Sequence, residues 1–299
     1  MDSSIIAEAR CRLHQKLVGD RTLSINEAGV ASIADSSQKT SRNIAIDLAE
    51  QLGAATSVKS PGQKAGAQFE IAIADFLRES LVPNPLFRNG EWSVENVGSS
   101  RSKDHIARFY PYRHLDELAE VVHDSPNMQA VLGNSYVVSP DVVVTRTPLS
   151  DDEINSEDEV VSERVGLMSP VREDNQTRRR KLDETPQDFA SIVHAVVSCK
   201  WTMRSDRAQN TRSEALNLIR NRKGRAPHIV AVTGEPTPSR IASIALGTGD
   251  IDCVYHFALP ELERAIERCD NDEAKTMLEI LIQGDRLRDI ADLPLDLIL

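Results

Sequence analysis

The hydrophobic pattern of the chain switches repeatedly between two periods. Four short runs are continuous in β-branched and apolar residues, which is typical of buried strands, and they cover residues 136–145, 192–200, 228–233 and 251–257. Around these runs, apolar residues recur every three or four positions, which predicts amphipathic helices. We expect helices over residues 5–18, 41–52, 64–81, 115–123, 208–221 and 238–246, and over most of the chain after 257.

Strands that alternate with helices predict an α/β protein, and we expect a mixed central β-sheet flanked by helices on both faces. The chain has 299 residues, enough for a sizeable core, and we assign residues 1–299 to a single domain. Residues 147–186 depart from the pattern because they are polar and rich in charge. They predict a long loop or partly disordered insertion at about 150–188 between two core strands.

Charge is distributed unevenly along the chain. The formal net charge is −11, and residues 151–163 hold seven acidic residues and no basic one. Residues 200–240, in contrast, hold nine basic and three acidic residues, and a local basic patch is sufficient for contact with nucleic acid. The net charge therefore argues against a DNA-binding surface over most of the molecule, but not in this segment.

Composition excludes a membrane protein. The apolar runs are far shorter than the roughly 18 residues of a membrane helix, and the N-terminus shows no secretory signal. The four cysteines are scattered, without the spacing of a metal site, and are expected to be reduced thiols. We therefore expect a cytoplasmic protein.

Two of the buried runs contain a charged residue. Asp141 follows Pro140 inside one run, and Lys200 closes another as Ser198-Cys199-Lys200. Charges on buried strands are costly unless they pair or hold a metal, and the PD-(D/E)xK nuclease core requires this arrangement. There the aspartate binds a hard divalent cation, and the residue before the lysine offers a carbonyl oxygen. A Pro-Asp pair also opens turns, and a lysine at a strand end often only reaches solvent.

Two glutamates are candidates for the same site. Glu214 lies in the helix after the Lys200 strand and could supply the carboxylate that an E-x-K motif would place at Ser198. Its alternative role is to face solvent beside nearby arginines. Glu70 shares a helical stripe with Ile73 and Leu77, so it points toward the core and needs a partner such as a metal.

Arg204, Asp206 and Arg207 lie at the start of the helix that carries Glu214. Arginine matches guanine O6 and N7 in the major groove, and aspartate accepts from cytosine N4. These residues could therefore read a G·C-rich sequence directly. The alternative is an ordinary helix N-cap with two solvated arginines.

These segments resemble the NgoMIV family of type II restriction endonucleases, which have a PD-(D/E)xK core. The resemblance covers most of the chain except the insertion at about 150–188. It is carried by the words Ser198-Cys199-Lys200-Trp201-Thr202, Arg204-Ser205-Asp206-Arg207-Ala208-Gln209-Asn210, Arg222-Lys223-Gly224-Arg225, Glu235-Pro236-Thr237-Pro238-Ser239-Arg240 and Ile251-Asp252-Cys253-Val254-Tyr255-His256-Phe257, and by the ending Asp292-Leu293-Pro294-Leu295-Asp296-Leu297.

The resemblance implies Mg²⁺-dependent cleavage of double-stranded DNA at the palindrome GCCGGC, with 5′ four-base overhangs, by a homotetramer that holds two duplexes. It implies that Asp141 and the Cys199 carbonyl bind metal, that Lys200 is catalytic, and that Glu70 and Glu214 complete the site. The residues that it implies for DNA reading are Arg204, Asp206 and Arg207 for the inner CCGG, and Asp35, Gln63 and Arg240 for the outer G·C pair.

Two other functions compete with this interpretation. A repair or recombination nuclease on the same core would cut without regard to a palindrome, and the cluster from Arg204 to Arg207 argues against it. An inert DNA-binding module is the second alternative, and the intact Asp141, Lys200 and Glu214 argue against that.

Overall fold

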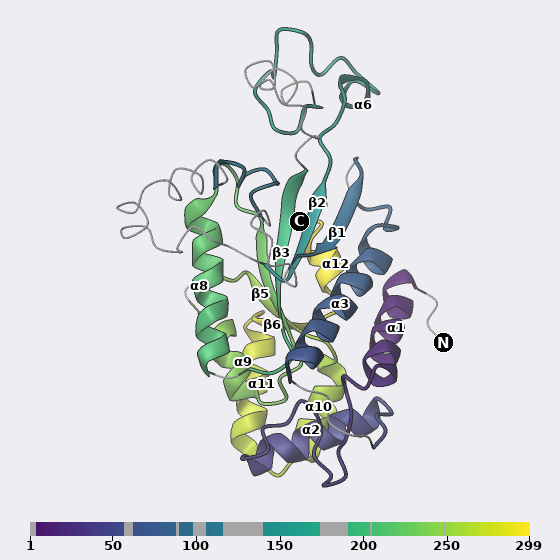
Figure 1. Cartoon of the computed structure of the whole chain (residues 1–299), viewed down its shortest axis with the longest axis vertical. Helices are drawn as coiled ribbons and strands as arrows, with labels where there is room; N and C mark the ends of the chain where they lie inside the picture. Colours follow the sequence, from purple (N-terminus) through teal and green to yellow (C-terminus); the bar gives the residue numbers. More distant parts are fainter. Residues whose placement is uncertain are drawn as a thin grey trace.

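The computed structural model describes residues 4–56, 62–87, 90–97, 106–115, 140–173, 191–203, 205–247 and 249–299. Its centre is a six-stranded sheet whose spatial order follows the chain order, β1-β2-β3-β4-β5-β6 (Figure 1). The strands are β1 (Trp92–Asn96), β2 (Val142–Arg146), β3 (Ile192–Lys200), β4 (His228–Thr233), β5 (Cys253–His256) and β6 (Leu287–Asp289).

The sheet is mixed, as the sequence predicts. β1 and β2 pair antiparallel, as do β2 and β3, whereas β3, β4, β5 and β6 run parallel. The parallel half explains the continuous apolar runs, because strands buried on both faces have no polar side. All six residues of β4 match the predicted run 228–233.

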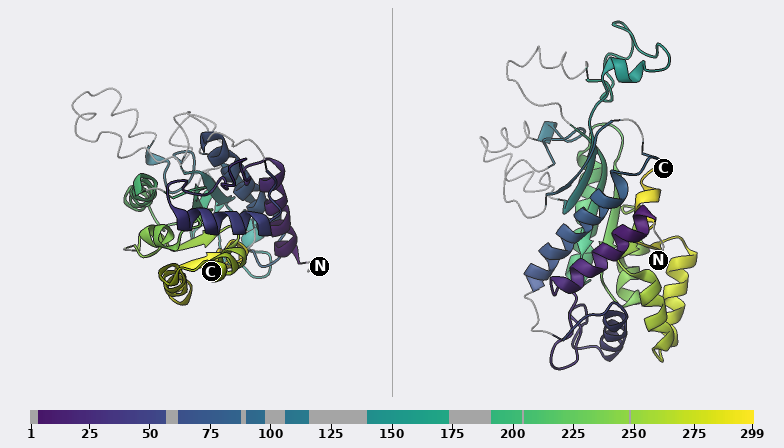
Figure 2. Two further views of the ribbon diagram at one scale, coloured as in Figure 1. Left: turned by 90° about the horizontal axis from the view of Figure 1, so that it is seen from below. Right: turned by 90° about the vertical axis from the view of Figure 1, so that its right-hand side faces the viewer.

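Helices cover both faces of the sheet. α1 (Ile5–Gly19), α3 (Gly62–Leu81) and α12 (Leu293–Asp296) lie on one side, and α8 (Ser205–Asn221), α9 (Pro238–Ala245) and α11 (Asp272–Gln283) lie on the other (Figure 1). α2 (Lys39–Gln51) packs against α10 (Leu259–Arg268) at one end of the molecule (Figure 2). The predicted fold class, a mixed sheet flanked by helices, is confirmed.

An apolar stripe explains how helix α3 packs on the sheet. Phe69, Ile73, Phe76 and Leu77 recur at helical spacing and are at most 1% exposed, so one stripe of the helix enters the core. Glu70 is only half-buried beside this stripe. The apolar stripe therefore fixes the helix on the sheet and carries Glu70 to the edge of the core.

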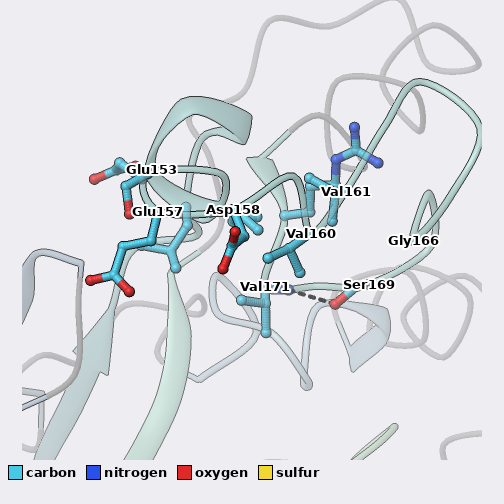
Figure 3. A pocket seen from close by; sticks show the side chains of 12 residues that line it. Glu153, Glu157, Asp158, Val160, Val161, Gly166, Ser169 and Val171 are labelled. Atoms are coloured by element: carbon cyan, nitrogen blue, oxygen red, sulfur yellow. Dashed lines mark hydrogen bonds between the residues drawn. The ribbon is translucent and has the colours of Figure 1, made fainter.

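Residues 149–173 form a lobe that projects from the end of β2 (Figure 1). It contains the short helix α6 (Asp151–Ile154), closed by a capping box between Ser150 and Glu153. The guanidinium of Arg172, whose side chain is 2% exposed, pairs with Asp151. A hollow in this lobe is lined by acidic and valine side chains (Figure 3). The described part of the insertion therefore contains a short capped helix and a buried ion pair, and the expected disorder stays a prediction.

Several sequence-based boundaries were wrong. β1 and β6 were not predicted, because each is short and lacks a continuous apolar run. β2 begins at Val142, so Asp141 precedes the strand and does not lie within it. Residues 136–139 and the predicted helix from 116 onward lie outside the described part of the chain. None of the described helices is long and apolar enough to cross a membrane.

Candidate active site

Asp141 and Lys200 meet where β2 begins and β3 ends. Lys200 Nζ donates to Asp141 Oδ2 at 2.8 Å, and the Cys199 amide donates to the same oxygen at 2.7 Å. Both charged side chains are 15% exposed. The antiparallel pairing of Val142 with Val197 produces this contact, because it places the residue before β2 beside the last residues of β3.

Glu70 and Glu214 approach this pair from helices on opposite sides of the sheet, α3 and α8 (Figure 1). Burial and the charges of Asp141 and Glu214 raise the pKa of Glu70 to about 7. Burial also raises the pKa of Glu214, where the charge of Lys200 opposes the shift and that of Asp141 adds to it. Each carboxylate therefore lies within electrostatic range of the Asp141–Lys200 pair.

Ser198 and Glu214 line one small cavity between β3 and α8. The Ser198 hydroxyl oxygen is buried and has no hydrogen-bond partner among the described residues. A buried hydroxyl without a partner is costly, so a group that enters this cavity would satisfy it. The sequence-based idea that Glu214 supplies the carboxylate missing at Ser198 agrees with this placement and stays a prediction.

Lys200 remains a cation in this environment. Burial would lower its pKa, but the nearby carboxylates of Asp141 and Glu214 raise it overall. The Cys199 thiol is fully buried, and its pKa is raised by burial, so it is not a reactive thiolate. The site therefore holds three carboxylates and one ammonium.

The donor set suits a hard divalent cation. Carboxylate oxygens are the ligands that Mg²⁺ and Ca²⁺ prefer, and a bound cation would offset the burial that raises the pKa values of Glu70 and Glu214. In the described part of the chain, no three acidic, histidine or cysteine side chains already converge at metal-binding distances. Lys200 and the Cys199 amide both bond Asp141 Oδ2, and Asp141 has a second carboxylate oxygen that could bind a cation. The role of the Cys199 carbonyl stays a prediction.

Arg240 and Asp35, both predicted DNA readers, form an ion pair with each other. Arg240 lies near the start of α9, and Asp35 lies in the loop before α2. Arg204 and the side chains of Gln63, Asp206 and Arg207 lie outside the described part of the structure. The backbone nevertheless places the start of α8 at Ser205, five residues after Lys200.

Glu235 is a residue that the sequence analysis did not single out. Its side chain is 1% exposed, and it accepts a hydrogen bond from the backbone of Met203 at 2.8 Å. The available signal was an acidic residue between the buried strand 228–233 and two prolines, because acidic residues are rarely buried without partners.

The family comparison is consistent with this geometry. The family model described as NgoMIV restriction enzyme matches residues 13–299. The chain belongs to the NgoMIV restriction enzyme family. It is also 45% identical over 294 residues to the type II restriction enzyme NgoMIV of Neisseria gonorrhoeae, an alignment that covers 98% of each chain.

Among solved structures, the chain matches one described as a restriction endonuclease PspGI–substrate DNA complex. The match has 13% sequence identity and a TM-score of 0.26, and it covers 98% of this chain and 90% of that chain. A score at this level does not establish a common fold, so the assignment rests on the sequence matches.

The predicted activity, a type II restriction endonuclease and therefore a site-specific DNA hydrolase, is confirmed by this membership. Enzymes of this class generally depend on a divalent metal and act on double-stranded DNA.

Proposed function

We propose that this NgoMIV-family enzyme cleaves double-stranded DNA at GCCGGC by Mg²⁺-dependent phosphodiester hydrolysis and leaves 5′ four-base overhangs. The observation that carries the chemistry is the contact between Lys200 Nζ and Asp141 Oδ2 at 2.8 Å, at the meeting point of two core strands. The proposed sequence follows from the 45% identity to NgoMIV over 98% of both chains and from the arginine-rich segment after Lys200.

In this proposal Asp141, Glu70, Glu214 and the Cys199 carbonyl hold the cation. Mg²⁺, when bound, supplies Lewis-acid stabilisation of the charge that develops on the phosphate. The Lys200 ammonium lies beside Asp141, so it can orient the attacking water and hydrogen-bond a phosphate oxygen. Burial in a site with little exposure strengthens both effects, because water screens the charges less.

Sequence reading is assigned to two groups of residues. Arg204, Asp206 and Arg207 would contact the inner CCGG, because arginine forks fit guanine and aspartate accepts from cytosine. Arg240 and Asp35, which pair with each other here, would contact the outer G·C pair together with Gln63. Exchange of this internal ion pair for base contacts would keep both charged groups partnered as DNA binds.

We propose in addition that the enzyme acts as a homotetramer in the bacterial cytosol and holds two duplexes. A tetramer with two binding sites should cleave a plasmid with two target sites faster than a plasmid with one. Sedimentation of the free enzyme gives an independent measure of the assembly.

The decisive test is digestion of two plasmids that differ only in one GCCGGC site. With Mg²⁺ we expect cleavage of the plasmid that carries the site, and sequencing of the ends should show a four-base CCGG overhang. EDTA should abolish cleavage, and Ca²⁺ should permit specific binding without turnover. Equal cutting of both plasmids would instead indicate a repair or recombination nuclease, and specific binding without cutting would indicate an inert DNA-binding protein.

A further inference from the structure

Glu235 joins two segments of the chain through its two carboxylate oxygens. It lies between β4 and α9 and is 1% exposed. Its Oε2 accepts from the Met203 amide at 2.8 Å, and its Oε1 accepts from the Thr237 amide at 3.1 Å. A buried carboxylate is costly unless such bonds are made. Burial raises the pKa of Glu235, and the bonds to Met203 and Thr237 oppose that shift.

The same loop also holds the backbone of the catalytic lysine. The Lys200 carbonyl accepts from Thr233 Oγ1 at 2.8 Å and from the Gly234 amide at 3.2 Å. Gly234 packs so closely on Trp201 that an added Cβ would lie 2.8 Å from the indole ring and 2.9 Å from the Trp201 carbonyl. The loop therefore fixes the chain from Lys200 to Met203, the residue before Arg204.

A third contact reaches Arg240. Its NH1 lies 3.9 Å from Glu235 Oε2 and donates to the Met203 carbonyl at 3.4 Å. Met203 is thus held from both of its backbone polar groups, by Glu235 at the amide and by Arg240 at the carbonyl. The segment that precedes Arg204 and the helix that carries Arg240 therefore contact each other at Met203, one residue before Arg204.

We propose that Glu235 is a positioning residue that fixes the backbone of Met203, which precedes Arg204 in the chain, the side chain of Arg240 and the backbone of Lys200 relative to one another. This rests on the proposed function, in which Arg204 reads inner base pairs and Arg240 reads the outer pair. An error at either pair would then displace the same carboxylate and, through it, the catalytic lysine. Discrimination at the inner and outer pairs is coupled for this reason.

Glu235→Gln tests the proposal because the change is nearly isosteric. Met203 and Thr237 bond different oxygens of Glu235, and glutamine replaces one of these oxygens with an NH2 donor, so one of the two backbone N–H groups loses its acceptor. We would compare kcat/KM on duplexes that contain GCCGGC, ACCGGT, altered at the outer pair, and GCATGC, altered at the inner pairs. We expect both specificity ratios to fall by about tenfold or more. Arg240→Ala, which removes the outer reader and its bond to the Met203 carbonyl, should lower the outer ratio more than the inner one.

Glu261→Gln is the matched control. Glu261 is another largely buried carboxylate, but its partners are Arg10 on α1 and Arg264 on its own helix, and we assign it no part in DNA reading. Its loss should reduce stability and leave both specificity ratios unchanged. Glu235→Asp, which retains the charge with a shorter reach, serves as a second variant if Glu235→Gln does not fold, and it should lower both ratios together.

The outcomes separate the two proposals. If the Glu235 variants lose stability but retain both specificity ratios, Glu235 only stabilises its loop and the inference is wrong. If they lower the outer ratio alone, coupling between the two readers is wrong. If the wild-type enzyme itself fails to distinguish GCCGGC from the altered duplexes, the proposed function fails independently of Glu235.

Discussion

Two clusters of charged side chains in this molecule have opposite electrostatics. The site cluster consists of Glu70, Asp141, Glu214 and Lys200, and the Arg10 cluster consists of Arg10, Glu261 and Asp289. Both lie largely out of solvent and both have an excess of carboxylates. In the site cluster, the pKa of Glu70 is raised to about 7 by burial and neighbouring carboxylates, whereas in the Arg10 cluster the pKa of Glu261 is lowered.

The Arg10 cluster satisfies itself. Arg10 Nε and NH2 donate to the two oxygens of Asp289 at 2.9 Å each, and NH2 also donates to Glu261 at 2.6 Å. Asp289 accepts in addition from the amides of Leu259 and Ala291. Although burial opposes ionisation of Glu261, the bonds from Arg10 lower its pKa overall. This geometry joins α1, α10 and β6 and requires no further ion.

The charged groups of the site cluster make fewer hydrogen bonds with one another than those of the Arg10 cluster. The one cation of the site cluster contacts Asp141, and burial raises the pKa values of Glu70 and Glu214 although the charge of Lys200 opposes both shifts. Strongly shifted pKa values of this kind gather at functional sites. The comparison favours a structural role for the Arg10 cluster, and it supports the proposal that the site cluster binds a cation.

The largest effect should come from Lys200→Ala and Asp141→Ala. Each removes one side of the 2.8 Å contact, and we expect kcat to fall by about 10³-fold or more while specific binding is largely kept, because binding depends on groove and phosphate contacts. Cleavage rates and gel shifts with a GCCGGC duplex provide the measurement. Turnover near that of the wild type in either variant would contradict the assignment of the site.

Arg10→Ala should have the next largest effect, and on a different quantity. It removes the cation that binds Asp289 and leaves Glu261 with Arg264 alone, so the free energy of unfolding should fall by about 3 kcal/mol, the lower end for removal of one partner from a buried ion pair. The rate per folded molecule should not change. Urea denaturation measures the free energy of unfolding, and active-site titration gives the turnover rate per folded molecule. A loss of turnover without a loss of stability would show that the Arg10 cluster also serves catalysis.

The hydrophobic pattern predicted most of the fold, because buried parallel strands and amphipathic helices leave a strong periodic signal. β4 and α9 lie where it placed them, to within one residue. β1 and β6 were missed because an edge strand exposes one side and carries polar residues, as Ser93, Glu95 and Asn96 do in β1. Their identity as strands comes from pairing with a neighbour, which is not a local property.

The site was predictable where charge interrupts an apolar run, as at Asp141 and Lys200. The registers of β2 and β3 that bring them together are set by tertiary pairing, and no local pattern specifies them. Glu235 was missed for a related reason. Its partners are backbone amides of Met203 and Thr237, and a side chain that binds backbone leaves no complementary residue in the sequence.

The pH dependence of stability gives a further test near the Arg10 cluster, because the charges of this cluster act on His256. His256, fully buried on β5, accepts from the Ala258 amide through Nδ1, and burial lowers its pKa to about 4, a shift that the charges of Asp289 and Glu261 oppose and that of Arg10 reinforces. As pH falls from about 6.5, the unfolded state gains a proton before the folded state does, so stability declines and the decline ends near pH 4. Between pH 7 and pH 5 this contributes about 2 kcal/mol.

His256→Asn should remove that part of the pH dependence, because asparagine retains an acceptor for Ala258 and does not titrate. His14, whose pKa is also lowered by burial, contributes equally in both proteins. Denaturant unfolding at pH 7 and pH 5 gives the comparison. An equal decline in the two proteins would assign the acid sensitivity elsewhere.

The smallest effect tests the site cluster through stability alone. Glu70→Gln removes a carboxylate whose pKa is raised by burial and by the charges of Asp141 and Glu214, so in EDTA the variant should be more stable than the wild type by about 1 kcal/mol. Mg²⁺ should reverse the order, because a ligand that binds only the folded state stabilises in proportion to its affinity, and the variant has lost a candidate ligand. Thermal melts with EDTA and with a Mg²⁺ series measure both effects without reference to cleavage.

Glu261→Gln is the control. It should lower stability in EDTA and show no dependence on Mg²⁺, since Arg10 already compensates that carboxylate. If Glu70→Gln destabilises the protein in EDTA, Glu70 makes a structural contact that favours its charge, and the two clusters do not differ in kind.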